Sequence, residues 1–423
     1  MDVELKYGEG KRTINIPEET DVDILRPASL PKLESIEEAL KRSLTNPLGL
    51  GGESFVDMLR RIRPKTLAIA VPDETRPVPL GKILPILLDQ VSEALPLHKT
   101  SSITIVVGGG LHPPMDRAGL DRVVTLEITR GCRVVAHDAK RDKMVDFGFT
   151  TRKTPVRVNA QYAKADVKMV VGQIDPHQFV GFTGGAKGAA IGCAAPETIE
   201  HNHSLLFDEN AQVGRLEGNP VREDLNEAGE MIGLDLAVNV VLDADKNVLR
   251  LLAGNPVEVL KEGAKTCAAV YGVAIEEKFD IIIASSGGHP KDICLYQAQK
   301  GLNLASQAVK KGGHILLLAS MPQGVGDDIY FDYVSQFTTP EEVLGDFKKI
   351  GFKMGAHKAY LFGRTLTNYD VAVFSDLDAG VLKKCHLRAA DHTAIIKEWV
   401  DGFEGRPRIG VIPNANTSYF YHK

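Results

Sequence analysis

Residues 167–206 read VKMVVGQIDPHQFVGFTGGAKGAAIGCAAPETIEHNHSLL. The first residues form a short apolar run typical of a buried strand in a parallel sheet, and we expect this strand to end near Ile174. His177 follows in the loop beyond the carboxyl end of the strand, which is where open α/β sheets bind ligands. This stretch therefore predicts an α/β fold with a functional site at the end of the strand.

A glycine-rich loop comes next, in which Gly184 and Gly185 precede Lys187, the only charged residue between positions 181 and 192. Glycines let the backbone take positive φ angles and approach a ligand closely, with amide groups turned toward an anion. The loop lacks the Gly-Lys-Ser/Thr ending of a phosphate loop, so an ATPase is disfavoured. A solvated turn is the alternative interpretation of the loop.

Pro196 and Glu197 are typical of the first turn of a helix, which then carries His201 and His203. Residues two apart on a helix point to different sides, so these two histidines should not bind one metal ion together. At most one of them is expected to face the site.

The bulk properties describe an ordinary globular chain. Its 423 residues exceed a single typical core and indicate two or three domains. Lys plus Arg number 50 against 55 Asp plus Glu, so a net charge of -5 gives no reason to expect nucleic acid or an anionic membrane as partner. The first residues show no basic region followed by an apolar core, so we expect no signal peptide, and the five scattered cysteines, Cys193 among them, suggest reduced thiols. We expect a cytoplasmic protein.

Strands and helices alternate along most of the chain, which predicts doubly wound parallel sheets in two Rossmann-like α/β domains. The domains are expected at residues 1–268 and 269–423, with the active site in the cleft between them. The first should contain a hairpin at 3–16, helices at 36–44, 55–62, 81–95, 220–232 and 256–271, strands at 67–71, 103–107, 133–136 and 167–174, and a strand pair at 236–252. The second should contain strands at 279–284, 314–318, 371–374 and 409–412, with helices at 340–350 and 393–403.

Polar side chains follow three of the predicted strands. Asp73 and Arg76 come after one strand, His112 after the next, and His177 after a third. Because the carboxyl ends of parallel strands share one edge of a sheet, we expect these side chains to meet in one crevice beside Lys187.

The second domain shows the same pattern of polar residues after the end of a predicted strand. Its first strand ends in a glycine-containing loop with His289, and the next helix carries Tyr296, Gln297 and Lys300. Tyr296 and Lys300 are one helical turn apart, so they share a face. A solvated helix surface is the alternative interpretation, and His289 can either line the site or be solvated.

Together these residues resemble the nickel-dependent lactate racemase family. The motifs in question span most of the chain: Asp73-Glu74-Thr75-Arg76-Pro77, Gly110-Leu111-His112, Asp175-Pro176-His177, Gly184-Gly185-Ala186-Lys187, Glu197-Thr198-Ile199-Glu200-His201-Asn202-His203, and Tyr296-Gln297 with Lys300. The resemblance implies two α/β domains and a nickel pincer cofactor, pyridinium-3,5-bisthiocarboxylic acid mononucleotide. It also implies cofactor-assembly proteins as partners, and a homo-oligomer is possible.

The resemblance assigns roles to individual residues. Lys187 would carry the cofactor through a thioamide, His203 would bind nickel, and Asp73, Gly184, Gly185 and Tyr296 would lie beside the cofactor. His112 and His177 would exchange the hydroxyl proton on opposite faces of a 2-hydroxy acid while hydride leaves C2 and returns through a 2-keto acid. Histidine suits this role because its pKa lies near neutrality. Arg76, Gln297 and Lys300 would hold the substrate.

Two departures from the family pattern leave the substrate open. Pro113-Pro114 follows His112 where relatives carry Arg-Pro, and Ala190-Ile191-Gly192 stands where lactate-type members have a Pro-Gly pair. Lactate is one option among short, longer, aromatic and dicarboxylic 2-hydroxy acids. Two other classes stay open: a zinc-type hydrolase or lyase using His112, His177 and His203, and a non-catalytic protein that binds an organic acid or a nucleotide.

Overall fold

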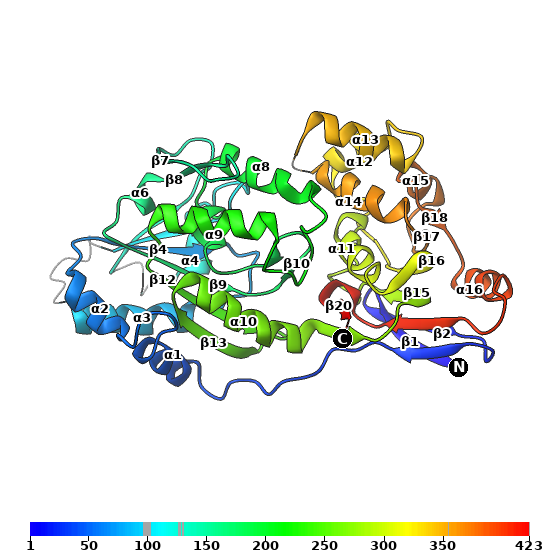
Figure 1. Cartoon of the computed structure of the whole chain (residues 1–423), viewed down its shortest axis with the longest axis horizontal. Helices are drawn as coiled ribbons and strands as arrows, with labels where there is room; N and C mark the ends of the chain where they lie inside the picture. Colours follow the sequence, from blue (N-terminus) through cyan, green and yellow to red (C-terminus); the bar gives the residue numbers. More distant parts are fainter. Residues whose placement is uncertain (96–102, 126–127, 129–130, 354, 423) are drawn as a thin grey trace. The chain divides into compact units, whose positions relative to one another are not determined.

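The computed structural model describes residues 1–95, 103–125, 128, 131–353 and 355–422 (Figure 1). The chain divides into two compact units. We call Leu30–Ala268 the central unit, and Met1–Ser29 with Ala269–Lys423 the terminal unit, because it holds both chain ends. The first 29 residues therefore belong with the C-terminal half, which differs from the expected range of 1–268.

The central unit is built on a six-stranded sheet in the order β13-β12-β9-β4-β5-β6. All neighbours are parallel except β12 and β13, which form an antiparallel pair at one edge. The strands are β4 (Leu67–Pro72), β5 (Ile103–Gly108), β6 (Arg133–Ala136), β9 (Val167–Gln173), β12 (Leu236–Leu242) and β13 (Val248–Gly254). Two small ladders lie outside this sheet: β7 (Met144–Phe149) with β8 (Pro155–Asn159), and β10 (Pro176–His177) with β11 (Gly181–Phe182).

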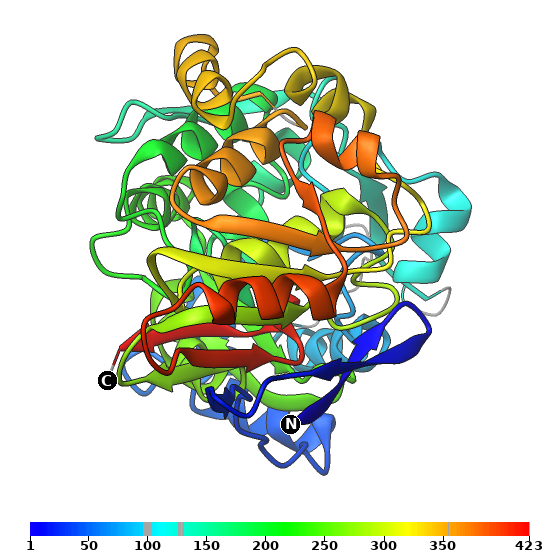
Figure 2. The ribbon, with the colours of Figure 1, turned by 90° about the vertical axis from the view of Figure 1, so that its right-hand side faces the viewer.

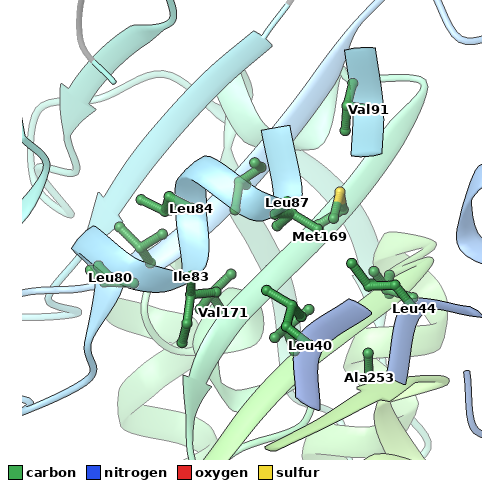
Figure 3. Close-up of a cluster of buried hydrophobic side chains, with 14 of the residues drawn as sticks. Leu40, Leu44, Leu80, Ile83, Leu84, Leu87, Val91, Met169, Val171 and Ala253 are labelled. Carbon is green, nitrogen blue, oxygen red and sulfur yellow. The ribbon is translucent and has the colours of Figure 1, made fainter. Parts of the chain in front are cut away.

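Helices cover both faces of the sheet, as doubly wound topology requires. They are α1 (Ile36–Thr45), α2 (Phe55–Ile62), α3 (Leu80–Ala94), α4 (Arg117–Val123), α6 (Ala160–Ala163), α7 (Lys187–Ala190), α8 (Pro196–Ser204), α9 (Pro220–Ile232) and α10 (Pro256–Tyr271), with a 3-10 turn η2 (Leu205–Phe207). Figure 3 shows one face, where Leu40 of α1 and Ile83 and Leu87 of α3 lie near Met169 and Val171 of β9. These side chains are almost fully buried, and each large aliphatic one contributes about 1.5–3 kcal/mol to folding.

The terminal unit contains a second six-stranded sheet, in the order β18-β17-β16-β15-β19-β3, with every neighbouring pair parallel. Its strands are β3 (Asp21–Ile24), β15 (Phe279–Ser285), β16 (Val309–Leu318), β17 (Asp370–Phe374), β18 (Arg388–Ala389) and β19 (Arg408–Ile412). Small ladders join β1 (Asp2–Tyr7) to β2 (Gly10–Asn15), and β14 (Gly272–Ile275) to β20 (Tyr419–His422).

The two faces of this sheet are covered by different elements. Helix α16 (His392–Asp401), seen across the sheet in Figure 2, shares one core with the N-terminal hairpin. The other face packs against α11 (Leu295–Ala305), α12 (Asp328–Val334), α13 (Pro340–Ile350) and α14 (His357–Leu366), while α15 (Ala379–Lys384) and η3 (Ala415–Thr417) complete the unit.

The N-terminal hairpin explains why the first residues leave the central unit. Alternate residues of β1, including Val3 and Leu5, are buried against Ile281 and Ile283 of β15. Farther along, β3 pairs in parallel with β19 and becomes the edge strand of the sheet. Hydrophobic burial and backbone pairing thus both attach residues 1–29 to the terminal unit.

The predicted α/β class with parallel sheets is confirmed, and the predicted strand pair at 236–252 is the antiparallel β12-β13 ladder. Within the part of the chain that the structure describes, no helix has the length and apolar character needed to cross a membrane.

Candidate active site

A pocket opens at the carboxyl ends of β4, β5 and β9 in the central unit, with an empty volume of about 750 Å³ that includes its open mouth. This is the size of a small-molecule site. Six of the predicted site residues line it: Asp73, Arg76, His112, Gly184, Gly185 and Lys187. Neighbouring strand ends therefore deliver these residues to one place.

Asp73 holds the ring of His112. The Asp73 Oδ2 atom lies 2.6 Å from the Nδ1 atom of His112, while Thr75 donates to Oδ1 through its hydroxyl at 2.5 Å and its backbone N–H at 3.1 Å. Burial alone would raise the pKa of Asp73, but the hydrogen bonds from His112 and Thr75 outweigh it and lower the pKa to about 2. The ionised carboxylate therefore accepts a hydrogen bond from the Nδ1–H of His112, which leaves the lone pair of the neutral ring on Nε2.

The glycine loop is shaped by close backbone contacts. Gly184 has a φ of +89°, and a Cβ atom there would lie 2.6 Å from Cγ1 of Ile174. The side chain of Asn239 accepts a 2.8 Å hydrogen bond from the N–H of Gly185. No side chain fits at Gly184, so bare backbone forms this part of the pocket wall.

Lys187 begins the short helix α7 directly after this loop. The next residue, Gly188, lets α7 lie against β9, since a Cβ atom at position 188 would be 2.2 Å from Cγ2 of Val170. Burial, followed by the nearby charges of Arg76 and Arg222, lowers the pKa of the Lys187 amine to about 7. A large fraction of the amine is thus neutral and nucleophilic near neutral pH.

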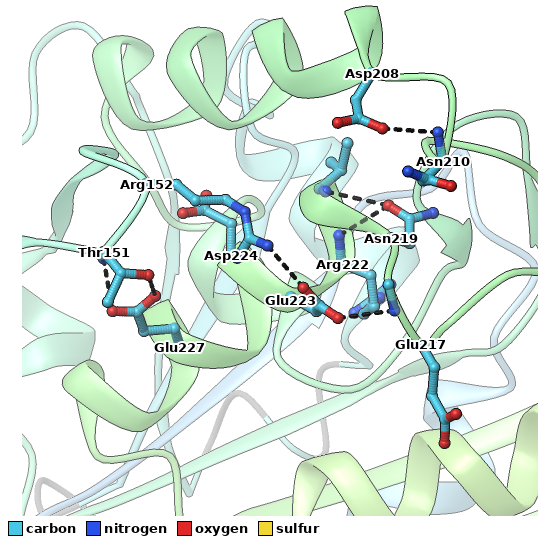
Figure 4. A network of polar contacts seen from close by, with 12 residues as sticks. Thr151, Arg152, Asp208, Asn210, Glu217, Asn219, Arg222, Glu223, Asp224 and Glu227 are labelled. Atoms are coloured by element: carbon cyan, nitrogen blue, oxygen red, sulfur yellow. Dashed lines mark hydrogen bonds and ion pairs between the residues drawn. The ribbon is translucent and has the colours of Figure 1, made fainter.

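Arg222 is a buried residue that holds the glycine loop in place through hydrogen bonds. It is 1% exposed on α9 and donates to the backbone carbonyls of Val180 and Gly184, both at 3.4 Å, and of Phe182. Figure 4 shows Arg222 at the start of α9, where the side chain of Asn219 caps the helix by accepting from the N–H of Arg222 at 3.2 Å. The buried guanidinium thereby fixes three carbonyls of the segment that leads to Lys187.

His177 and His203 both pack against the ring of Phe179. The ring of Phe179 is centred 4.6 Å from that of His177 and 5.2 Å from that of His203. The Nδ1 atom of His177 accepts a hydrogen bond from the N–H of Val180 at 3.3 Å. In its neutral form His177 therefore carries its proton on Nε2, opposite to His112.

The two histidines of α8 point to different sides, as their spacing predicts. His201 Nε2 bonds to the carbonyl oxygen of Arg152 at 3.0 Å. His203 is 8% exposed, and its Nδ1 atom lies 3.1 Å from Oδ1 of Asn202. Of the two, it is His203 that packs beside Phe179.

Arg76 is exposed at the pocket wall. In the described parts of the chain its guanidinium forms no ion pair, whereas the neighbouring Glu74 pairs with Arg122 at 3.0 Å. An unpaired guanidinium in a pocket is suited to bind a carboxylate in a bidentate manner.

In the terminal unit, Tyr296 and Lys300 share a face of α11 and Gln297 is exposed beside them. Lys358 lies over the Tyr296 ring, with Nζ 5.0 Å from the ring centre. Burial, then the charge of Lys300, lowers the pKa of Lys358 to about 8. His289 is exposed, and its N–H donates to the carbonyl of Gly8 at 2.8 Å.

The described residues contain no group of three or more His, Cys, Asp or Glu side chains that could hold a metal ion. His112, His177 and His203 therefore do not form the three-histidine group that a zinc-type hydrolase or lyase would need. A single imidazole suits a metal whose other ligands come from a cofactor.

Four residues of interest were not predicted: Asn202, Arg222, Asn239 and Lys358. Asn202 stands between His201 and His203 in the motif at residues 197–203, and this position in the sequence could have marked it as a site residue. The other three lie far along the chain from the motifs they contact, and only the fold brings them near.

The fold and the pocket define a two-unit α/β enzyme with a small-molecule site. Two family models match the chain: the lactate racemase N-terminal domain over residues 7–214, and the lactate racemase C-terminal domain over residues 275–416. These two matches cover most of the chain, so it belongs to the lactate racemase family of isomerases acting on hydroxy acids.

Individual relatives agree with this assignment. A lactate racemase of Lactiplantibacillus plantarum is 30% identical over 389 residues, covering 90% of both chains. One of Thermoanaerobacterium thermosaccharolyticum is 28% identical over 382 residues, covering 88% of both. The lactate racemase apoprotein structure from the latter organism superposes with a TM-score of 0.89 at 26% identity over all of both chains. A Thermotoga maritima structural-genomics structure, at 16% identity and TM-score 0.63 over 94% of this chain and all of its own, shares the fold.

Proposed function

We propose that this protein inverts C2 of a 2-hydroxy acid, lactate or a related 2-hydroxycarboxylate, by hydride transfer to and from a nickel pincer nucleotide. The observation that carries the proposal is the Asp73–His112 pair, which lines one pocket together with Arg76 and Lys187. The hydrogen bond to Asp73 leaves the lone pair of neutral His112 on Nε2, so this atom can take a hydroxyl proton. A racemase also needs a second group that gives a proton to the substrate oxygen, and His177 in its protonated form would be that group.

The pocket fits the cofactor that the family implies. Bare backbone at Gly184 and Gly185 gives room for a nucleotide phosphate, and Lys187 offers a nucleophilic amine beside it. His203 would supply the imidazole ligand to nickel. When bound, the cofactor would accept and return the C2 hydride.

The remaining steps belong to the protein. Arg76 would bind the substrate carboxylate through its guanidinium. His112 Nε2 would take the hydroxyl proton as the alcohol becomes a 2-keto acid. His177, in its protonated form, would return a proton to that oxygen and become neutral when hydride comes back to the opposite face. In the reverse direction the two histidines exchange roles, and Asp73 holds His112 oriented in both directions. By resemblance, Gln297 and Lys300 would help to hold the substrate, and Tyr296 the cofactor.

The test is chiral chromatography of single enantiomers of 2-hydroxy acids, beginning with lactate, after co-expression with cofactor-assembly proteins. We expect the loaded enzyme to convert either lactate enantiomer, or those of a related acid, to a racemic mixture. His112→Gln and His177→Gln should each lower the rate by about 10²–10⁴-fold. Binding of the acids without any inversion by the loaded protein would instead support the organic-acid-binding alternative.

A further inference from the structure

Asn202 lies between His203 and a buried carboxylate, Asp224, whose side chain is 0% exposed. We infer that Asn202, held by Asp224, fixes the ring tautomer of His203 so that Nε2 presents its lone pair to the metal. Asn202 is thus a positioning residue. The metal half of this inference rests on the proposed function, in which His203 binds nickel.

The orientation of the Asn202 amide follows from its donors. Its Nδ2 atom donates to the backbone carbonyl of Val221 at 3.1 Å and to Oδ2 of Asp224 at 2.8 Å. A backbone carbonyl can only accept, so the nitrogen of the amide must face Val221. Both amide hydrogens are then used, and the oxygen is the atom that faces Nδ1 of His203 at 3.1 Å.

Asp224 is itself held on both oxygens. Thr150 donates to Oδ1 at 2.5 Å, and Thr154 donates to Oδ2 at 2.7 Å. The Thr150 hydroxyl accepts from the N–H of Thr154 at 3.0 Å, which leaves its own hydrogen for Asp224. Because this network is buried, a flip of the amide would place like atoms together without water to compensate.

The consequence is a single tautomer for His203. An amide oxygen can only accept, so Nδ1 must carry hydrogen, and the lone pair of the neutral ring lies on Nε2. Imidazoles that bind metals generally donate their other N–H to such a partner, which fixes the ring orientation and raises the basicity of the ligand. The chain therefore prepares His203 before any metal is present.

The first experiment reads the tautomer directly. Nitrogen NMR of the full chain without cofactor, labelled only at histidine and recorded where the rings are neutral, distinguishes Nδ1–H from Nε2–H, and the His203 signal is the one lost in His203→Gln. We expect Nδ1–H in the native chain and a mixture of tautomers in Asn202→Ala. Thr150→Val is the matched control: it removes a donor to Asp224 but keeps Asn202, so the tautomer should not change.

The second experiment measures nickel retained by the loaded enzyme under a chelator. Asn202→Ala should lose nickel about 10–100-fold faster than the native enzyme or Thr150→Val. Nε2–H on native His203 overturns the inference without any variant, as does an unchanged tautomer in Asn202→Ala. Native nickel retention in His203→Ala would instead contradict the proposed nickel ligand, and with it the metal half of the inference, while the measured tautomer would stand.

Discussion

Asp73 and His112 follow different strands, 39 positions apart, yet their side chains meet with Oδ2 of Asp73 2.6 Å from Nδ1 of His112. Thr75 occupies the other carboxylate oxygen. We propose that Asp73 acts at the site by orienting the His112 ring.

Asp73→Asn should therefore lower kcat by about 10²–10⁴-fold in both directions, because an amide cannot stabilise the protonated ring and can select the wrong tautomer. Steady-state kinetics on both enantiomers measures this. Thr75→Val serves as the control and should have a much smaller effect. Since Asp73 acts through His112, adding Asp73→Asn to His112→Gln should cost little more; full additivity would contradict the assignment.

The pKa of Lys187, about 7, gives a pH-dependent stability. The folded-state pKa lies below the unfolded value of about 10.4, so burial of the charged amine destabilises the apoprotein fully below pH 7. This penalty disappears as pH rises from about 7 to about 10.4. Lys187→Met should thus be more stable than the native chain in urea at pH 7, with a gap that shrinks toward pH 10. A gap independent of pH would argue against a depressed pKa.

Gly188 sets the distance between α7 and β9. Gly188→Ala places a methyl group 2.2 Å from Cγ2 of Val170, so we expect a loss of about 1–3 kcal/mol in stability and displacement of Lys187. Val170→Ala removes the atom that clashes. The double variant should recover part of the stability lost by Gly188→Ala, as measured by urea unfolding, and no recovery would show that the contact with Val170 is not the cause.

Arg222 should contribute to stability through the several N–H donors of its guanidinium, and to the pKa of Lys187 through its charge. Arg222→Met leaves buried carbonyls of the loop without their donors and should cost on the order of 3 kcal/mol. It also removes a cation near Lys187, so the pKa of that amine should rise. Arg222→Lys keeps the positive charge but loses the several N–H donors of the guanidinium. This variant should be less stable than the native chain, with a smaller change in the pKa of Lys187. The pKa is measured by chemical labelling of the Lys187 amine across pH. Equal pKa values in both variants would count against this role of the Arg222 charge.

The sequence predicted those elements whose signal is local. Apolar runs such as residues 167–174 marked the buried strands, and parallel topology then placed Asp73, His112 and Lys187 at one sheet edge. Hydrophobic alternation also revealed the N-terminal hairpin. It did not reveal which sheet the hairpin covers, because an amphipathic strand pair can pack on any apolar face.

The rest depended on contacts between distant residues. Arg222 looks like a surface residue of an amphipathic helix, and only the fold shows it buried beneath the glycine loop. Asp224 and Asn202 are 22 positions apart, and nothing in their local sequence indicates that they bond. Lys358 likewise reaches Tyr296 only through the packing of α14 on α11.

The most direct test of the proposed function is the intact mass and nickel content of the native chain and Lys187→Ala, both co-expressed with cofactor-assembly proteins. We predict an added mass equal to the pincer nucleotide and about one nickel per native chain, with both absent in the variant. Neither added mass nor nickel in the native chain, under conditions that load a known relative, would contradict the account.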